Sequence, residues 1–280
     1  MDMIPEVSVI IPSFDGARGG NLSKLLDDLK KQSFKDYEVI VITGISPNGR
    51  ARNEGVKKAQ GEILVFMDDD AVLGTEQVIE NLIKPFESDG RIGMTGSAIL
   101  VPPQADWLQR RWAKLRPTFE APMVEQITDS DLAQHTCCAL PAKVYKEVGW
   151  ESDDLITGTD NDLRQRLHQA GYRVVLVPQA WVYHIPPKKL KKIIKACFHH
   201  GVGAAYALQN HPEMFGYPVV LGFYRIKTSF GSLIYRIITL FLKFIINLIT
   251  LRPIRLIFEL FNHLGFIRGW FKYLNTDIHK

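Results

Sequence analysis

The amino-acid sequence predicts an α/β fold: a Rossmann-like, mostly parallel sheet flanked by helices, followed by a C-terminal extension of amphipathic helices. Two observations predict it. Short apolar runs alternate with helical patterns over residues 7–101, and most of these runs end at Gly, Pro or a polar cluster. Residues 188–280 lack that alternation and show long helical periodicity instead.

The alternation gives specific elements in the first part of the chain. Strands are expected at the apolar runs Val7–Phe14, Tyr37–Thr43, Ile63–Met67 and Ile92–Val101. Helices are expected where Leu22, Leu25, Leu26 and Leu29 share one face, over Gly49–Gln60 and over Thr75–Ser88. Strands joined by helices run parallel, and such sheets bind ligands beyond the carboxyl ends of their strands.

The middle of the chain is less regular. Residues 102–134 mix Trp107 and Trp112 with prolines and charges, which fits either an insertion that shapes a binding pocket or a surface excursion. Regularity returns with helices predicted near Ala142–Val148 and Asp160–Ala170 and a strand at Tyr172–Pro178.

Composition fits a folded protein in a reducing compartment. The 280 residues are 46 % hydrophobic, which is ample for a packed core. The three cysteines are odd in number and two of them are adjacent, so no disulfide framework is expected. The start, MDMIPEVSVIIPSF, has no basic leader and is predicted to be a first strand rather than a signal peptide.

Charge is distributed unevenly along the chain. Residues 1–187 hold 20 Lys and Arg against 27 Asp and Glu, whereas residues 188–280 hold 14 against 3. The acidic first part argues against nucleic acid as a ligand. The basic and apolar tail predicts contact with an anionic membrane surface.

The tail run Ser232–Leu251 is long enough to cross a bilayer, but its polar residues recur at helical spacing. These residues are Arg236, Thr239, Lys243, Asn247 and Thr250. Lys243 near the middle would cost about 2.5 to 3.5 kcal/mol facing lipid. We expect two helices lying in the membrane interface, the second after Pro253. A helical hairpin packed on the first domain and a true membrane span are the alternatives.

Three aspartates, Asp68, Asp69 and Asp70, directly follow the predicted strand Ile63–Met67. Adjacent carboxylates repel each other unless a cation or hydrogen bonds compensate. Because side chains two apart in an extended chain point the same way, Asp68 and Asp70 can converge on one ion while Asp69 turns aside. Oxygen ligands of this kind suit Mg²⁺ or Mn²⁺. A solvated acidic turn is the alternative.

Three stretches resemble glycosyltransferase family 2, the inverting enzymes with the GT-A fold. They are VSVIIPSFD, ARNEGVKKAQGEILVFMDDD and GTDNDLRQRLHQAGYRVVLVPQAWVYH, and together they span Val7 to His184. The resemblance implies a GT-A catalytic domain over residues 1–187, with a nucleotide-sugar half at about 1–101 and an acceptor half at about 102–187. The basic, apolar helical tail of residues 188–280 follows it.

The resemblance also implies roles for individual residues. Asp68 and Asp70 occupy the outer positions of the DXD motif, with Asp70 on the metal, Asp68 nearer the donor ribose, and His184 as a further metal ligand. Asp160 falls where the family places its catalytic base. Residues implied in donor binding are Pro12, Ser13, Asp15, Arg52, Asn53, Asp68 and Asp69. From the residues alone, Asp160 also fits a helix N-cap, His184 a structural histidine, and Arg52 with Asn53 an ordinary helix start.

The sequence departs from the family pattern at two positions. The usual acidic pair after the second strand is replaced by Thr43 and its neighbours, so uracil specificity is not expected. Thr159 replaces the glutamate that usually precedes the base, which removes a carboxylate able to raise the pKa of Asp160. Further along, His199, His200 and Gly201 follow a basic stretch that fits either a phosphate contact or a solvated helix.

The expected reaction is transfer of a sugar from a nucleotide-diphosphate sugar to a hydroxyl, with Mg²⁺ or Mn²⁺ at the DXD motif and Asp160 as general base. The expected setting is the cytoplasmic face of the cell membrane, acting on a lipid-linked or envelope glycan. Two alternatives remain: a catalytically degenerate nucleotide-sugar-binding or assembly subunit, and a phosphohydrolase of the haloacid dehalogenase type with Asp68 as nucleophile.

Overall fold

The computed structural model describes residues 4–116, 118–211, 230–249 and 253–273. The chain packs as two compact units. The first unit is built from the residues up to Asp154 together with Thr159–Pro186, and the second from Leu155–Gly158 and the residues after Pro186.

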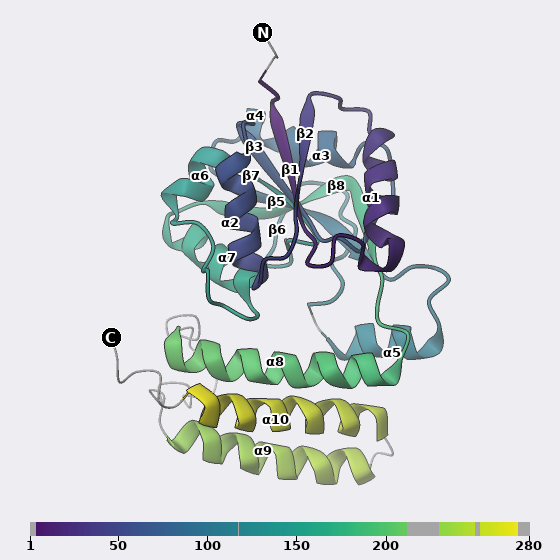
Figure 1. Cartoon of the computed structure of the whole chain (residues 1–280), viewed down its shortest axis with the longest axis vertical. Coiled ribbons are helices and arrows are strands. Elements are labelled where there is room, and N and C mark those ends of the chain that lie inside the picture. Colours follow the sequence, from purple (N-terminus) through teal and green to yellow (C-terminus); the bar gives the residue numbers. More distant parts are fainter. Residues whose placement is uncertain (1–3, 117, 212–229, 250–252, 274–280) are drawn as a thin grey trace. The chain divides into compact units, whose positions relative to one another are not determined.

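The first unit is an α/β domain. Its strands are β1 Val7–Pro12, β2 Tyr37–Ile42, β3 Ile63–Met67, β4 Ala71–Leu73, β5 Ile92–Leu100, β6 Thr128–Asp129, β7 Cys137–Pro141 and β8 Arg173–His184. Its helices are η1 Arg18–Gly20, α1 Asn21–Lys30, α2 Asn48–Lys58, α3 Val78–Ile83, α4 Pro85–Ser88, α5 Trp107–Leu115, α6 Ala142–Glu147 and α7 Thr159–Gln169. In Figure 1, α2, α6 and α7 lie on one side of the sheet and α1 lies on the other.

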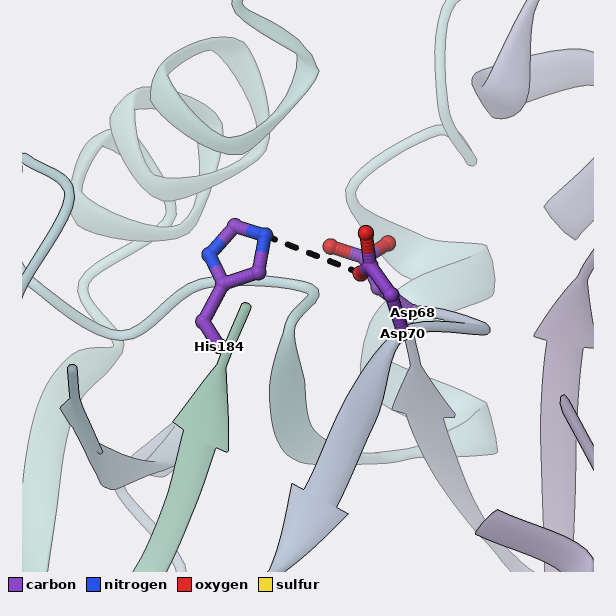
Figure 2. A group of neighbouring side chains, drawn as sticks. All are labelled: Asp68, Asp70 and His184. Atoms are coloured by element: carbon purple, nitrogen blue, oxygen red, sulfur yellow. Dashed lines mark ion pairs between the residues drawn. The ribbon is translucent and has the colours of Figure 1, made fainter. Parts of the chain in front are cut away.

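The strands form one mixed sheet in the order β2-β1-β3-β7-β5-β8-β4, with β6 paired to β8. Strands β1, β2 and β3 are parallel to one another, and β5 is parallel to β8. Strands β4, β6 and β7 are antiparallel to their neighbours. The end of β8 lies close to the acidic residues after β3 (Figure 2), so the sheet brings distant parts of the chain together.

The four strands expected from apolar runs in the first part are all present, but β7 was not predicted. Strand β7 is inserted antiparallel between β3 and β5. Its sequence, CCALP, is short and follows the irregular middle segment. Periodicity alone cannot assign so short an apolar run to a strand.

Two other predicted boundaries need correction. The strand expected at Tyr172–Pro178 continues to His184. Gln179 has φ 56°, and the register against β5 shifts nearby, so the strand passes Pro178 through an irregularity rather than ending there. The helix expected over Thr75–Ser88 is divided into α3 and α4 at Pro85, which has no backbone N–H to continue the helical hydrogen bonds, although Lys84 before it keeps helical angles.

The irregular middle segment contains one helix, α5, that was not predicted. Its N-terminus is a capping box: the Asp106 side chain accepts a hydrogen bond from the Gln109 backbone, and the Gln109 side chain accepts one from Asp106. Gln109 also donates from its side chain to the carbonyl of Pro186 at 2.6 Å. These bonds attach the segment to the end of the sheet domain.

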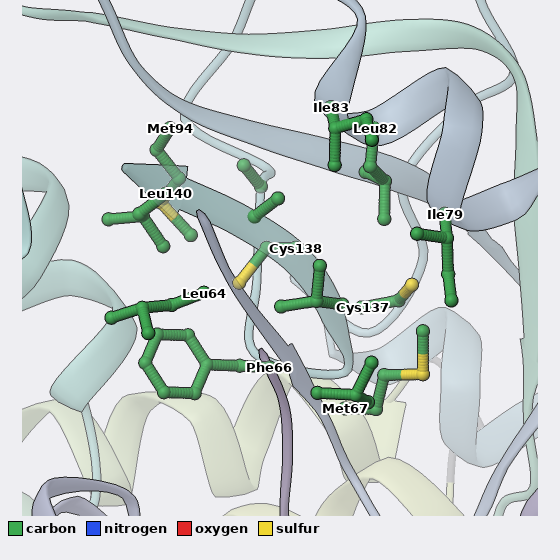
Figure 3. Packing of buried hydrophobic residues seen from close by; sticks show 14 of the residues in the cluster. Leu64, Phe66, Met67, Ile79, Leu82, Ile83, Met94, Cys137, Cys138 and Leu140 are labelled. Carbon is green, nitrogen blue, oxygen red and sulfur yellow. The ribbon is translucent and has the colours of Figure 1, made fainter. Parts of the chain in front are cut away.

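The core of the first unit lies around β3 and β7. Leu64 and Phe66 of β3 are fully buried, as are Cys138 of β7 and Leu82 of α3, and Figure 3 shows their packing. All three cysteines of the chain are buried and free. Because β3 is central and buried on both faces, its sequence is a continuous apolar run.

The second unit contains the helices α8 Leu190–Asn210, α9 Phe230–Ile249 and α10 Pro253–Tyr273. Helices α8 and α10 pack through glycines: a Cβ on Gly201 would meet the carbonyl of Asn262, and one on Gly265 the backbone of Phe198. Gly201 therefore serves helix packing and not a phosphate contact. Among the described residues, no helix combines the length and apolar character of a membrane span.

Helix α9 differs from the helix that was expected. Its polar residues face α10: Lys243 forms an ion pair with Glu259 at 3.1 Å, and Asn247 is 4 % exposed. Its apolar residues are exposed, up to 75 % at Ile249. At the predicted stripe, Lys243 therefore pairs with α10 while remaining 46 % exposed, and Asn247 is buried. The side chains of Arg236 and Thr250 lie outside the described residues.

We predict that Gly61→Ala destabilises the first unit by about 1 to 3 kcal/mol, because a Cβ there would lie 2.6 Å from the Ser8 nitrogen, in the backbone of β1. Gly90→Ala is the matched control, since a Cβ at Gly90 meets nothing within 4 Å. Urea unfolding of both variants tests this, and equal midpoints for the two would contradict it.

Candidate functional site

The candidate site is built on strand ends. Asp68 and Asp70 follow β3, and His184 is the last residue of β8. One ligand atom from each of these three side chains lies within 4.8 Å of the others. Figure 2 shows the imidazole of His184 facing the two carboxylates. Two carboxylates and one imidazole form a donor set that fits a divalent cation, which would also offset the repulsion between the acids.

The imidazole of His184 is held in a defined plane. Its ring stacks on Phe119, with centroids 4.6 Å apart and an interplanar angle of 10°. Its Nε2 atom lies 3.6 Å from Oδ1 of Asp70. Phe119 comes from the irregular segment whose contacts the sequence did not predict. Through this stacking contact, Phe119 and its segment help to fix the position of the His184 ring.

Arg18 is a residue of this site that sequence reasoning missed. Its Nη2 atom donates to Oδ2 of Asp70 at 2.8 Å, and its Nε lies 3.4 Å from Asp69. Burial raises the pKa of Asp69 and the adjacent carboxylates add to the rise, while Arg18 opposes it. In this structure the guanidinium of Arg18 supplies positive charge to the acidic cluster.

Asp68 is linked to the interior by Arg52, a buried residue of α2. The Nη2 atom of Arg52 donates to Asp68 at 3.2 Å, and its Nη1 donates to Glu151 at 3.2 Å. Glu151 is fully buried, and its second oxygen makes a very short contact with Nε2 of His135. Arg52 thus lies beneath the acidic cluster, already paired with two carboxylates.

Contacts between oppositely charged groups run from Asp68 through Arg52, Glu151 and His135. They end at Asp160, in the first turn of α7. Oδ1 of Asp160 accepts a hydrogen bond from the His135 backbone at 2.8 Å and lies 2.6 Å from its Nδ1. Burial alone would raise the pKa of Asp160, but the charges of His135 and Arg52 hold that pKa well below its usual range. Asp160 is therefore a carboxylate at neutral pH, with its side chain still 31 % exposed.

The replacement of the usual glutamate by Thr159 is partly offset by Glu151. The Thr159 hydroxyl lies at the limit of hydrogen bonding from Arg52, at 3.5 Å. Glu151 supplies a carboxylate to the same guanidinium from another segment. A carboxylate is thus present near the base position, although the sequence next to Asp160 does not show it.

The other residues predicted to bind the donor differ in their burial and in their hydrogen-bond partners. Pro12 and Ser13 are buried at the end of β1. Asp15 accepts hydrogen bonds from the backbones of Ala17 and Arg18, which orders the loop. The amide of Asn53 makes four hydrogen bonds to the segment around Glu151, which fills its capacity. The structure places Asn53 as a support for Glu151.

Sequence reasoning missed five residues that shape the site: Arg18, Phe119, His135, Thr136 and Glu151. None lies in a recognised motif, and each reaches the site through the fold. A weak signal existed for His135 and Thr136, which immediately precede the apolar run of β7 and so lie at a strand end. The Thr136 hydroxyl donates to Oδ2 of Asp68 at 3.1 Å.

Sequence comparison finds one matching family and a curated relative. The sequence model of the family described as Glycosyltransferase like family 2 matches residues 43–203, more than half of the chain. Glycosyltransferase AglE of Haloferax volcanii is 24 % identical over 229 residues, which cover 71 % of this chain and 73 % of the relative.

Structure comparison finds glycosyltransferases with the same fold. The mannosyltransferase PcManGT from Pyrobaculum calidifontis, solved with GDP-Man and Mn²⁺, superposes with a TM-score of 0.60 and 15 % identity, covering 97 % of this chain and 88 % of that one. GalNAc-T7, solved with UDP, GalNAc and Mn²⁺, gives 0.52 and 17 % identity over 78 % of this chain and 52 % of that one. At these identities the likeness shows the fold, which is GT-A.

We predict that Glu151→Gln destabilises the first unit by about 3 to 5 kcal/mol, because it leaves Arg52 and His135 buried without their shared carboxylate. The exposed Glu54, paired with Lys57 on α2, provides the control Glu54→Gln, which should leave the unfolding midpoint unchanged. Chemical denaturation measures both. A loss for Glu151→Gln no larger than that of the control would show that the buried network contributes nothing to stability.

Proposed function

The chain belongs to the family Glycosyltransferase like family 2 and is a glycosyltransferase, and we propose that it transfers its sugar with inversion of configuration at the anomeric carbon. In this proposal a sugar passes from a nucleotide-diphosphate sugar to a hydroxyl acceptor in a single displacement. The observation that carries it is the convergence of Asp68 and Asp70, after β3, with His184, at the end of β8, and their link through buried charges to Asp160.

The acidic cluster is the proposed donor site. Asp70, Asp68 and His184 would hold Mg²⁺ or Mn²⁺, which supplies the positive charge that a departing diphosphate requires. Support comes from the donor set itself, in which three ligand atoms lie within 4.8 Å. PcManGT and GalNAc-T7, which share the fold, were both solved with Mn²⁺.

Asp160 is the proposed general base. Its carboxylate takes the proton of the acceptor hydroxyl while that oxygen bonds to the anomeric carbon. The bond from the anomeric carbon to the diphosphate breaks, and its electron pair leaves with the diphosphate. Attack on the face opposite the leaving group inverts the anomeric centre. The depressed pKa keeps Asp160 deprotonated, as this role requires.

The haloacid dehalogenase alternative, with Asp68 as a nucleophile, is set aside because the family match covers the acidic cluster. The donor nucleotide is proposed to be other than a uridine nucleotide, since Thr43 and Gly44 follow β2 where an acidic pair is usual. A degenerate binding subunit remains the second candidate function. The departure at Thr159 favours it, and turnover of a donor separates the two.

We propose that the second unit attaches the enzyme to the cytoplasmic face of the cell membrane, where a lipid-linked or envelope glycan is the acceptor. The polar side of α9 is occupied by α10 through Lys243 and Glu259. The exposed side chains of α9 are therefore mainly apolar, Phe241 and Ile249 among them. A basic stretch at the start of α8 adds attraction to anionic lipid.

Calorimetric titration with GDP, UDP and other nucleoside diphosphates, with Mn²⁺ and with chelator, tests the donor site. We expect one nucleotide to bind only with metal, and Asp70→Ala to abolish that binding because a central ligand is lost. Asp27→Ala, on the exposed face of α1, is the control and should bind like wild type. Absence of binding to every nucleotide by folded protein would sink the donor-site assignment.

Vesicle flotation tests the membrane proposal. The double substitution Phe241→Glu with Ile245→Glu should weaken binding to phosphatidylcholine–phosphatidylglycerol vesicles by more than about 100-fold, because two apolar side chains lose their burial in lipid. Val39→Glu, at an exposed apolar position of β2, is the matched control. Equal flotation of the double variant and the control would exclude α9 as the attachment surface.

A further inference from the structure

Two adjacent residues, His135 and Thr136, contact two different parts of the proposed site, the acidic cluster and the proposed general base. They directly precede β7, the antiparallel strand between β3 and β5. The Thr136 hydroxyl donates to Asp68 at 3.1 Å, and the His135 backbone donates to Asp160 at 2.8 Å. The carboxylate near the donor and the proposed base are thus held by neighbouring residues of one segment.

The His135 ring is enclosed by charged groups from several elements. Glu151, from the segment after α6, contacts Nε2, and Asp160 of α7 contacts Nδ1. Arg52 of α2 opposes a positive charge on the ring, and Arg164 of α7 lies within the field of Asp160. The remaining neighbours are uncharged: Phe66 of β3 meets the ring edge-on, and burial keeps the thiol of Cys138 protonated.

The two carboxylates outweigh the opposing influences. Burial lowers the pKa of His135, and so does Arg52, but Glu151 and Asp160 raise it above its ordinary value overall. This balance favours the protonated ring, and each of its nitrogens lies close to a carboxylate oxygen. Its side chain is 1 % exposed, so it cannot reach a substrate.

We propose that His135, held in place by Glu151, is the positioning residue of the general base. Its backbone N–H donates to Oδ1 of Asp160, and its Nδ1 lies 2.6 Å from the same oxygen. Oδ2 is left as the oxygen that receives the acceptor proton. This proposal rests on the assignment of Asp160 as the base in the proposed function.

The arrangement has a chemical consequence. When the acceptor O–H bond breaks, its proton forms a bond to Oδ2 of Asp160, and the proton on Nδ1 of His135 stays where it is. The imidazolium fixes the carboxylate and keeps it ionised in acidic solution. Removing it should let the pKa of Asp160 rise, because burial then acts with less opposition.

A merely structural ion pair is the competing explanation. Buried charge pairs are often replaceable by apolar residues without loss of stability, so packing alone gives no strong reason for this one. The two explanations differ in what they predict for the pH dependence of turnover. A structural pair affects folding, whereas a positioning residue affects the protonation and placement of Asp160.

Histidine NMR of the full-length protein tests the charge state without any substrate. With ¹⁵N-labelled histidine, the resonance lost in His135→Gln identifies His135. We expect its midpoint to lie above that of a free imidazole in wild type and to fall in Asp160→Asn, because one of its two carboxylate neighbours loses its charge. A midpoint of His135 below that of a free imidazole, or one unmoved by Asp160→Asn, would overturn the proposal.

Turnover tests the positioning role. With Mn²⁺ and GDP-mannose as donor, release of nucleotide is followed against pH. His135→Gln should bind GDP within about twofold of wild type, lose about 10- to 100-fold in turnover, and shift its acid limb to higher pH. His135→Asn is a second variant in case the first folds poorly.

The outcomes separate the two proposals. If Asp160→Asn is inactive while folded His135→Gln keeps wild-type turnover and an unmoved acid limb, the positioning role is refuted and the base assignment stands. If Asp160→Asn retains turnover, the base assignment of the proposed function fails, and the positioning role fails with it.

Discussion

Compensation of buried negative charge is the constraint on which the functional half of this protein depends. Carboxylates gathered at the end of a central strand repel each other and lose hydration, so each requires a nearby cation or donor. Arg18 supplies charge to Asp70, Arg52 to Asp68 and Glu151, and His135 to Glu151 and Asp160. These three cationic groups come from separate parts of the chain and converge only in the folded domain.

The mixed sheet explains how one site can depend on so many segments. Strands β1 to β3 form a parallel set, and the antiparallel β7 separates them from β5 and β8. The loop before an antiparallel strand lies at the same edge as the carboxyl ends of its neighbours. His135 and Thr136 therefore meet the residues that follow β3, and the backbone of β7 fixes their positions.

The second unit shows a different arrangement of charge. Lys243 and Glu259 pair between α9 and α10 and Asn247 is buried, while large apolar side chains of α9 remain exposed. In water such a surface is unfavourable, whereas in contact with lipid its exposed apolar area is stabilising. The stability of the α9–α10 pair therefore depends on whether lipid or water contacts the exposed apolar side chains of α9.

Local chemistry determined much of what the sequence predicted. The apolar runs predicted β1, β2, β3 and β5, and the DXD residues with Asp160 and His184 were found through motif resemblance. These features lie within short stretches, where periodicity and spacing carry the information. Tertiary structure alone decided the antiparallel place of β7, the extension of β8 past Pro178 and the pairing of Lys243 with Glu259. It also brought Arg18, Phe119, His135 and Glu151 to the site, because pairing between residues that lie from 16 (His135 and Glu151) to 99 (Arg52 and Glu151) positions apart leaves no local pattern in the chain.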